Sequence, residues 1–150
     1  MNLETLLIDQ DKRGVVSLTV NRPEKRNALS ARMIDELTRF TSSLTPDIRA
    51  VVIQGAGQLF CAGGDLDWMN AQMSADRKTR IAEARKLALM LKALNEIPVP
   101  LIAKVHGAAY GGGVGVDCVC DFVISSSNGK FGFTETRLGL LPARIGAYGI

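Results

Sequence analysis

The chain has 150 residues, of which 47% are hydrophobic and 22% are charged. This length and composition predict a single globular domain over residues 1–150, and the 5% aromatic content predicts that its core is aliphatic. The net charge of +3 arises from basic residues interspersed with acidic ones, which argues against nucleic acid as a partner. A modest positive balance suits an anionic ligand that carries phosphate groups.

The cysteines and the single histidine exclude several classes of site. Cys61, Cys118 and Cys120 are odd in number and lack CxxC spacing, which argues against a disulfide framework and a zinc site. His106 stands alone, so no multi-histidine metal centre is expected. The N-terminus lacks a signal-peptide pattern, and no apolar run approaches the ~20 residues that span a bilayer. We therefore expect a cytoplasmic protein with no membrane partner and no metal.

The first half of the chain predicts three strands and one amphipathic helix. Short aliphatic runs predict the strands, at residues 3–8, 15–20 and 48–53. The last run does not alternate with polar residues, which is typical of a strand buried on both faces. Ser30 is a good N-cap for the helix. Behind it, apolar residues recur at helical spacing: Met33, Leu37, Phe40 and Leu44.

The second half predicts further helices and strands in alternation. Asp65 is expected to cap a helix after the first glycine loop, and Ser74 to cap a long helix that ends near residue 95. The buried stripe of this long helix is expected at Ile81, Ala84, Leu87, Ala88, Leu91 and Leu94. Another helix is predicted to run through Val119. Strands are predicted at residues 101–105, 121–125 and 130–133. This alternation predicts an α/β fold with short parallel strands.

Two glycine-rich loops, at residues 63–64 and 111–113, connect predicted strands to helices. Backbone N–H groups at a helix start lack intrahelical acceptors and carry the positive end of the helix dipole. Glycine lets a ligand approach such groups closely, and two of them converging on one oxygen would form an oxyanion hole. The simpler alternative is a pair of tight turns. Dinucleotide binding is disfavoured because no GxGxxG follows an early strand.

Four sequence blocks occur in a characteristic order: NRPEKRNALS (21–30), FCAGGDL (60–66), HGAAYGGGVG (106–115) followed by CD (120–121), and FGFTETRLGLLP (131–142). In their order and spacing, the chain resembles the N-terminal part of the crotonase (enoyl-CoA hydratase/isomerase) superfamily. The resemblance implies an α/β spiral core of ββα turns that binds an acyl-CoA thioester. The motifs look most like those of methylglutaconyl-CoA and isohexenylglutaconyl-CoA hydratases.

The resemblance also implies roles for individual residues. The backbone N–H groups of Gly64 and Gly112 would form the oxyanion hole, and Glu135 would transfer protons as general acid and base. The residues expected to contact the substrate and its coenzyme A are Arg26, Ala28, Ala62, Gly63, Asp65, Leu66 and Gly111. Coenzyme A is part of the substrate, so no separate cofactor is expected.

The carboxylates in the sequence do not decide between hydration and isomerisation. Many hydratases of this family carry a second glutamate where this chain has Gly115. A single glutamate can shuttle a proton between two carbons, which is isomerase chemistry, or can suffice for hydration if another group positions the water. Similarity of the GGGVG run to hydratases of branched, carboxylated substrates favours hydration. Without the resemblance, Glu135 would be read as an exposed glutamate beside Arg137.

Length and neighbouring residues raise further alternatives. Family members are longer than 150 residues, so the C-terminal helical region that covers the acyl site and builds a trimer is expected to be absent. The chain is then either part of a homo-oligomer, a trimer or hexamer, or a truncated and catalytically inactive chain.

Three residues near the glycine loops have two possible placements each. Asp117 could be an interior hydrogen-bonding group or face the acyl pocket. Trp68 and Met69 could line that pocket or pack in the core.

Overall fold

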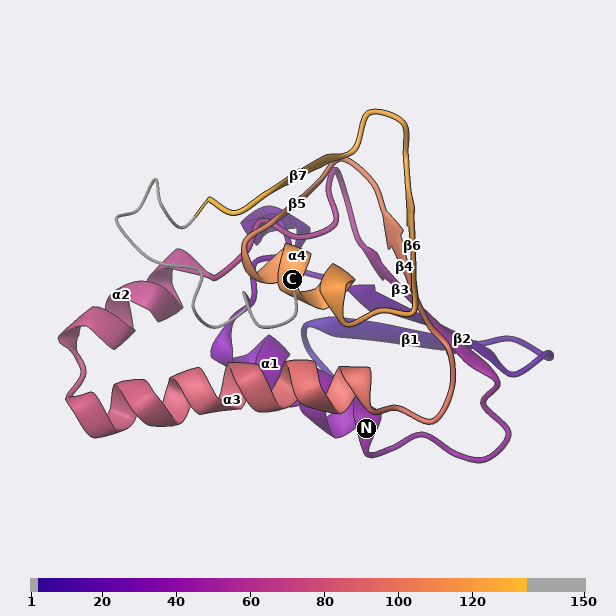
Figure 1. Ribbon diagram of the computed structural model, residues 1–150, viewed down its shortest axis with the longest axis horizontal. Coiled ribbons are helices and arrows are strands. Elements are labelled where there is room, and N and C mark those ends of the chain that lie inside the picture. Colours follow the sequence, from indigo (N-terminus) through magenta and orange to yellow (C-terminus); the bar gives the residue numbers. More distant parts are fainter. Residues whose placement is uncertain (1–2, 135–150) are drawn as a thin grey trace.

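The computed structural model describes residues 3–134, which form two sheets and four α-helices (Figure 1). The larger sheet has the strand order β1-β2-β3-β4-β6, and the smaller one pairs β5 with β7. Their bounds are β1 Leu6–Gln10, β2 Val15–Val20, β3 Ala50–Gly55, β4 Leu101–Val105, β5 Ala108–Tyr110, β6 Phe122–Ser125 and β7 Lys130–Gly132. Only β1 and β2 pair antiparallel, and every other pairing is parallel. The α/β class with short parallel strands is confirmed.

The helices cover one side of the larger sheet and one end of the molecule. Their bounds are α1 Ala31–Thr41, α2 Leu66–Ser74, α3 Arg77–Asn95 and α4 Gly112–Cys118, and a single 3-10 turn, η1, spans Pro23–Lys25. Figure 1 shows α1 and α3 running together along the sheet, while α4 lies between them and the small β5–β7 sheet. None of the helices in this described part of the chain is both long and apolar enough to cross a membrane.

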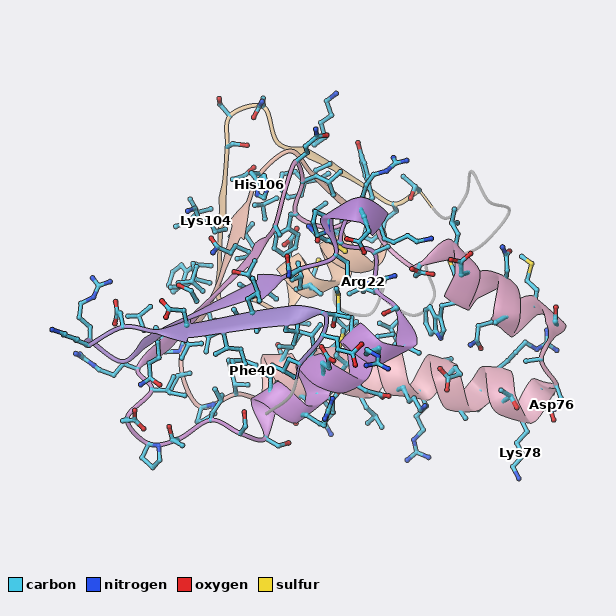
Figure 2. All side chains as sticks on the ribbon, turned by 180° about the vertical axis from the view of Figure 1, so that it is seen from behind. Arg22, Phe40, Asp76, Lys78, Lys104 and His106 are labelled. Carbon is cyan, nitrogen blue, oxygen red and sulfur yellow. The ribbon has the colours of Figure 1, made fainter. Side chains whose placement is uncertain are left out.

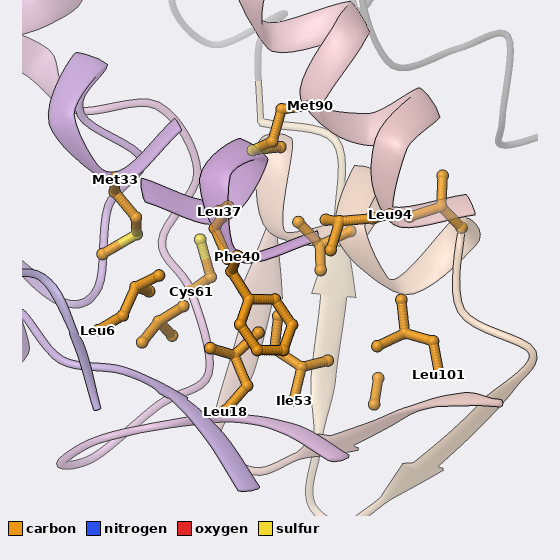
Figure 3. Close-up of a cluster of buried hydrophobic side chains, with 14 of the residues drawn as sticks. Leu6, Leu18, Met33, Leu37, Phe40, Ile53, Cys61, Met90, Leu94 and Leu101 are labelled. Carbon is orange, nitrogen blue, oxygen red and sulfur yellow. The ribbon is translucent and has the colours of Figure 1, made fainter. Parts of the chain in front are cut away.

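The core lies between the larger sheet and the helices α1 and α3. Alternate residues of β2, β3 and β4 are buried on this face: Val16, Leu18, Val20, Val51, Ile53, Leu101, Ala103 and Val105. Phe40 from α1 and Leu94 from α3 pack against them (Figure 3). Apart from Phe40 and Phe60, the large buried side chains are aliphatic or methionine. This confirms the expected aliphatic core.

Several predicted boundaries are confirmed and others shift. The strands at 15–20 and 101–105 have the predicted bounds. Ser30 caps α1, because its hydroxyl accepts a hydrogen bond from the Met33 N–H at 3.3 Å. The strands predicted at 3–8 and 48–53 each begin later, at Leu6 and Ala50. The prediction that the latter is buried on both faces is wrong for residues 3–134, in which β3 alternates between buried and half-buried residues and the described helices lie on one face.

The long helix starts later than predicted. Ser74 ends α2, and Asp76 caps α3 by accepting a hydrogen bond from the Thr79 N–H at 2.7 Å. Asp76 marks the outer junction of the two helices (Figure 2). Ile81 is 57% exposed rather than buried, because the first half of α3 extends past the sheet beside α2 (Figure 1). The buried stripe is confirmed only further along, at Leu87, Leu91 and Leu94.

Candidate active site

The first glycine loop is laid against the segment that precedes α1. The Leu29 N–H donates to the Gly63 carbonyl oxygen at 2.7 Å, and the Asp65 N–H donates to the Leu29 carbonyl oxygen at 3.0 Å. A third hydrogen bond joins the Ala62 N–H to the Arg26 carbonyl oxygen at 3.0 Å. Two segments far apart in sequence therefore run side by side like short parallel strands.

This pairing fixes the direction of the Gly64 N–H. The N–H belongs to the same peptide unit as the Gly63 carbonyl, and in a planar trans peptide the two bonds point in opposite directions. With the carbonyl held by Leu29, the N–H points away from Leu29 and meets no acceptor within residues 3–134. Met69 lies close to this position, since a Cβ added to Gly64 would sit 3.0 Å from the Met69 sulfur. The free N–H is therefore available to a ligand oxygen.

The second glycine loop places another donor at the start of α4. Gly111 adopts φ 46°, and Gly112 is the first helical residue. The Gly112 N–H therefore has no intrahelical acceptor and lies at the positive end of the helix. Substitution of Gly111 by a residue with a side chain would be strained, because positive φ disfavours a Cβ.

The structure brings the two loops into contact. A Cβ added to Gly63 would lie 3.7 Å from the Gly112 nitrogen, and one added to Gly112 would lie 3.9 Å from the Gly63 carbonyl carbon. Backbone hydrogen bonds hold this arrangement, from the Cys61 N–H to the Ala108 oxygen at 3.1 Å and from the Tyr110 N–H to the Cys61 oxygen at 2.9 Å. Two predicted donors from separate loops thus lie on adjoining backbone.

The other expected contact residues divide into two places. Ala28, Ala62, Gly63, Asp65 and Gly111 lie in or beside the paired loops, and Leu66 opens α2 with 62% of its surface exposed.

Arg26 joins the paired loops through its carbonyl oxygen, and it also lines a cavity of about 310 Å³ together with Pro23, Ala56, Gly57, Gln58 and Leu59. The predicted catalytic Glu135 lies outside the described residues. Gly115 is buried in α4, and it supplies no carboxylate there.

Both carboxylate oxygens of Asp65 are engaged in structural contacts. One oxygen accepts from the Asp67 and Trp68 N–H groups at 3.0 and 3.1 Å, which confirms the predicted cap of α2. The other oxygen pairs with Arg22 Nη1 at 2.9 Å. Burial alone would raise the pKa of Asp65, but the hydrogen bonds from Trp68 and Arg22 outweigh it and hold the pKa below its ordinary value. The backbone of Asp65 is engaged as well, because its N–H donates to the Leu29 carbonyl oxygen and its carbonyl oxygen accepts from the Met69 N–H at 2.9 Å.

Asp117 is buried, but the predicted interior hydrogen bond is not found among the described residues, and whether it faces the acyl pocket stays a prediction. It is 6% exposed, and neither carboxylate oxygen has a hydrogen-bond partner among the described residues. Burial raises the pKa of Asp117 to about 7. Because a buried carboxylate without a partner is costly, the protonated form is favoured over a wide range of pH. The residue lies on α4, the helix that begins at Gly112.

Two residues with clear roles escaped the sequence-based prediction. Asn27 is fully buried, and its side chain bonds to the loop that follows β3. Arg22, labelled in Figure 2, joins Asp65 to the Ala28 carbonyl oxygen, which it reaches at 2.8 Å. The only signal was an asparagine and an arginine inside an otherwise charged loop, and such residues are usually exposed. Trp68 is half-buried against the core and donates to Glu83 at 3.1 Å.

Comparison with known proteins identifies the family. The family model described as enoyl-CoA hydratase/isomerase matches residues 10–148. A curated relative, the probable enoyl-CoA hydratase echA8 of Mycobacterium bovis, is 37% identical over 98% of this chain and 56% of its own length. The human mitochondrial methylglutaconyl-CoA hydratase is 32% identical over 90% of this chain and 40% of its own length.

Solved structures agree with this assignment. Pseudomonas aeruginosa AtuE superposes with a TM-score of 0.92 at 38% identity, covering 97% of this chain and 57% of AtuE. An enoyl-CoA hydratase from Shewanella pealeana gives a TM-score of 0.93 at 32% identity, covering 97% of this chain and 56% of that structure. The crotonase-like fold expected from the sequence is thereby confirmed, and the chain spans about half the length of the curated relatives that it matches. The chain belongs to the enoyl-CoA hydratase/isomerase family.

Proposed function

We propose that this chain supplies the oxyanion hole of an acyl-CoA hydratase that acts on a 2-enoyl-CoA. The observation that supports this function is the pair of N–H groups of Gly64 and Gly112, which lie on touching loops and lack acceptors within residues 3–134. When a nucleophile adds to the double bond, negative charge develops on the thioester oxygen as an enolate. Two N–H donors aimed at that oxygen stabilise the charge, and each typically contributes about 3–4 kcal/mol to lowering the barrier.

Glu135 is proposed as the group that moves protons in this reaction. In hydration, the oxygen of water bonds to C3 of the enoyl group while Glu135 accepts a proton from that water. A proton is then delivered to C2, so that the enolate collapses to a 3-hydroxyacyl-CoA and atoms balance. Gly115 offers no second carboxylate on α4, so one glutamate would serve as both base and acid.

The acyl group is proposed to be branched or carboxylated. Support comes from the motif resemblance and from the 32% identity to a relative named methylglutaconyl-CoA hydratase. Pocket chemistry alone discriminates acyl groups weakly, because one methylene or hydroxyl changes binding in an apolar pocket by only about 1–3 kcal/mol.

Glu135→Gln tests the proposed chemistry. Hydration is followed as loss of the conjugated thioester absorbance, and acyl-CoA binding is measured separately by calorimetry. We expect kcat to fall about 10²–10⁴-fold, the usual contribution of general acid–base catalysis, while binding is retained. Arg137→Gln, a change two residues away, is the matched control and should retain activity. Full activity in Glu135→Gln would overturn the role of this glutamate.

An enoyl-CoA isomerase is the second candidate, and the glycine at position 115 favours it. With one carboxylate, a proton can be removed from C2 of a 3-enoyl-CoA and returned to C4, through the same enolate and the same oxyanion hole. Conversion of 3-enoyl-CoA to 2-enoyl-CoA without a 3-hydroxyacyl product would establish isomerisation instead of hydration.

A catalytically inactive chain is the third candidate, because the chain spans 56% of a relative such as the M. bovis protein. Turnover by the 150-residue chain, together with acyl-CoA binding by calorimetry, would exclude it.

A further inference from the structure

The segment that carries Leu29 to the first glycine loop has an unusual backbone. Arg26 and Asn27 adopt φ values of 51° and 54°, two consecutive non-glycine residues in the left-handed region. Asparagine tolerates this region better than most residues, whereas arginine visits it rarely. Such a conformation persists only where surrounding contacts hold it in place.

The side chain of Asn27 supplies those contacts. It is fully buried, and its amide nitrogen donates to the carbonyl oxygens of Ala56 and Leu59 at 2.7 and 2.9 Å. Its amide oxygen accepts from the Arg22 N–H at 2.9 Å. Both donors and the oxygen of the amide are therefore satisfied, and the segment is fastened to the loop that follows β3.

This anchor lies two residues from the hydrogen bond that orients the first oxyanion donor. The Leu29 N–H holds the Gly63 carbonyl at 2.7 Å, and this carbonyl shares a planar peptide with the Gly64 N–H. Arg22 strengthens the same segment from its other side, because one guanidinium nitrogen reaches both the Ala28 oxygen and Asp65.

The second donor is held differently. Gly112 is positioned by α4 and by the backbone pairing of Cys61 with Ala109, although the Leu29 side chain also lies beside it, since a Cβ added to Gly112 would sit 2.7 Å from Leu29 Cδ1. A change at Asn27 therefore acts on the Gly64 donor through a hydrogen bond of Leu29, and reaches Gly112 only through packing against the Leu29 side chain.

We infer that Asn27 is a positioning residue for catalysis: its buried amide, acting through Leu29, aims the Gly64 N–H at the thioester oxygen. This inference rests on the proposed oxyanion function. It assigns no contact between Asn27 and the substrate. Misplacement of a reacting group by about 1 Å can cost about 10²-fold in rate, so a side chain outside the site can control turnover.

Asn27→Gly distinguishes the effect of the side-chain amide from the effect of the left-handed backbone conformation. Glycine accepts the left-handed φ without strain, so the variant removes the buried side chain and its three hydrogen bonds without straining the backbone. Asn128→Gly, at an exposed asparagine in a turn, is the matched control. The decisive measurement is the infrared stretching frequency of the ¹³C-labelled thioester carbonyl in bound enoyl-CoA, taken at saturation so that weakened binding does not enter.

We expect the wild-type chain and Asn128→Gly to lower this frequency relative to free enoyl-CoA. Asn27→Gly should move it back toward the free value and reduce kcat about 10²-fold, at an unchanged far-ultraviolet circular dichroism spectrum. A folded Asn27→Gly with wild-type carbonyl frequency would overturn the inference and leave the oxyanion function standing. Absence of any shift in the wild-type chain would overturn both.

A milder variant keeps the test decisive if Asn27→Gly does not fold. Arg22→Lys retains the positive charge beside Asp65 but loses the guanidinium that spans two acceptors. It should show the same direction of frequency change with a smaller loss of kcat. A wild-type carbonyl frequency in Arg22→Lys would then count against the positioning network.

Discussion

At Gly112, the backbone N–H can be removed while the helix keeps its first residue. Proline is favoured at the first helical position and has no N–H, so Gly112→Pro deletes the proposed donor. A Cβ at this position would lie 2.7 Å from Leu29 Cδ1, and Gly112→Ala introduces the same contact while keeping the N–H. We expect kcat of the proline variant to fall about 10²–10³-fold below that of the alanine variant in steady-state hydration assays.

Equal turnover of the proline and alanine variants would show that the Gly112 N–H does not stabilise the reacting oxygen. Loss of turnover in both would instead trace the defect to the Leu29 contact.

Residues differ in how far the sequence predicted their roles. Gly64 and Gly112 could be chosen from the sequence because close approach to a backbone N–H requires glycine and because both lie in recognisable motifs, and their role as donors stays a prediction. Asp65 was predictable as a cap from its place before a helix. The role of Asn27 depends on the carbonyl groups of Ala56 and Leu59, and no local pattern indicates that these oxygens surround it.

At the scale of elements, α4 carries a buried acid that makes stability depend on pH. Burial raises the pKa of Asp117 from 3.8 to about 7. Between these values the folded state binds more protons than the unfolded chain, so the free energy of unfolding decreases as the pH rises. At about 1.4 kcal/mol per pKa unit, the decrease is at most about 4 kcal/mol. Among the described residues 3–134, the titratable groups that interact with Asp117 are the thiols of Cys61, Cys118 and Cys120, and none of these is a cation.

Asp117→Asn should remove most of this dependence, measured by urea unfolding at about pH 5 and pH 8. The interval from pH 5 to pH 8 lies above the titration of Asp65 and Glu36, whose pKa values are lowered in the fold. Protonation of these two carboxylates reduces stability only in more acidic solution. Asp9→Asn changes an exposed acid and serves as the control. An unaltered pH slope in Asp117→Asn would contradict the assignment.

Elements were predicted where their signal was local. Strand β2 and helix α1 have regular apolar spacing, and their predicted starts are confirmed. Strand β5 was missed because its three residues lie among glycines and alanines, and it is held by long-range pairing with β7 and with Cys61. Ser74 and Asp76 are both good caps by residue type; the packing of α2 against α3 selects the second.

At the scale of the whole molecule, stability depends on the core shared by the larger sheet, α1 and α3. Phe40 is 2% exposed at its centre, whereas Leu7 on β1 is 55% exposed. Phe40→Ala should lower the free energy of unfolding by about 3–5 kcal/mol, because it removes buried surface and leaves a cavity. Leu7→Ala, the control, should change it by roughly 0.5 kcal/mol or less. Urea denaturation followed by circular dichroism measures both, and similar losses would contradict the assigned core.

The fold class followed from the alternation of strands and helices, but the exposure of individual faces did not. The apolar sequence of β6 is typical of a buried strand, yet Phe122 and Ile124 are 63% and 64% exposed. Within residues 3–134 no helix packs on that side of β6 and only β4 pairs with it. Periodicity reports which residues could be buried, whereas burial itself requires a partner element.

The parallel pairing of β2, β3, β4 and β6 determines when the candidate site forms during folding. Two parallel strands can pair only after the long connection between them has been ordered, which costs chain entropy before the pairing stabilises the fold. Folds built from such pairings therefore form slowly. Leu29, Gly64 and Gly112 belong to three successive crossovers of this sheet. They can meet only after the strands that separate them have paired. Competence to bind a thioester oxygen therefore arises late in folding, well after the first helical turns have formed.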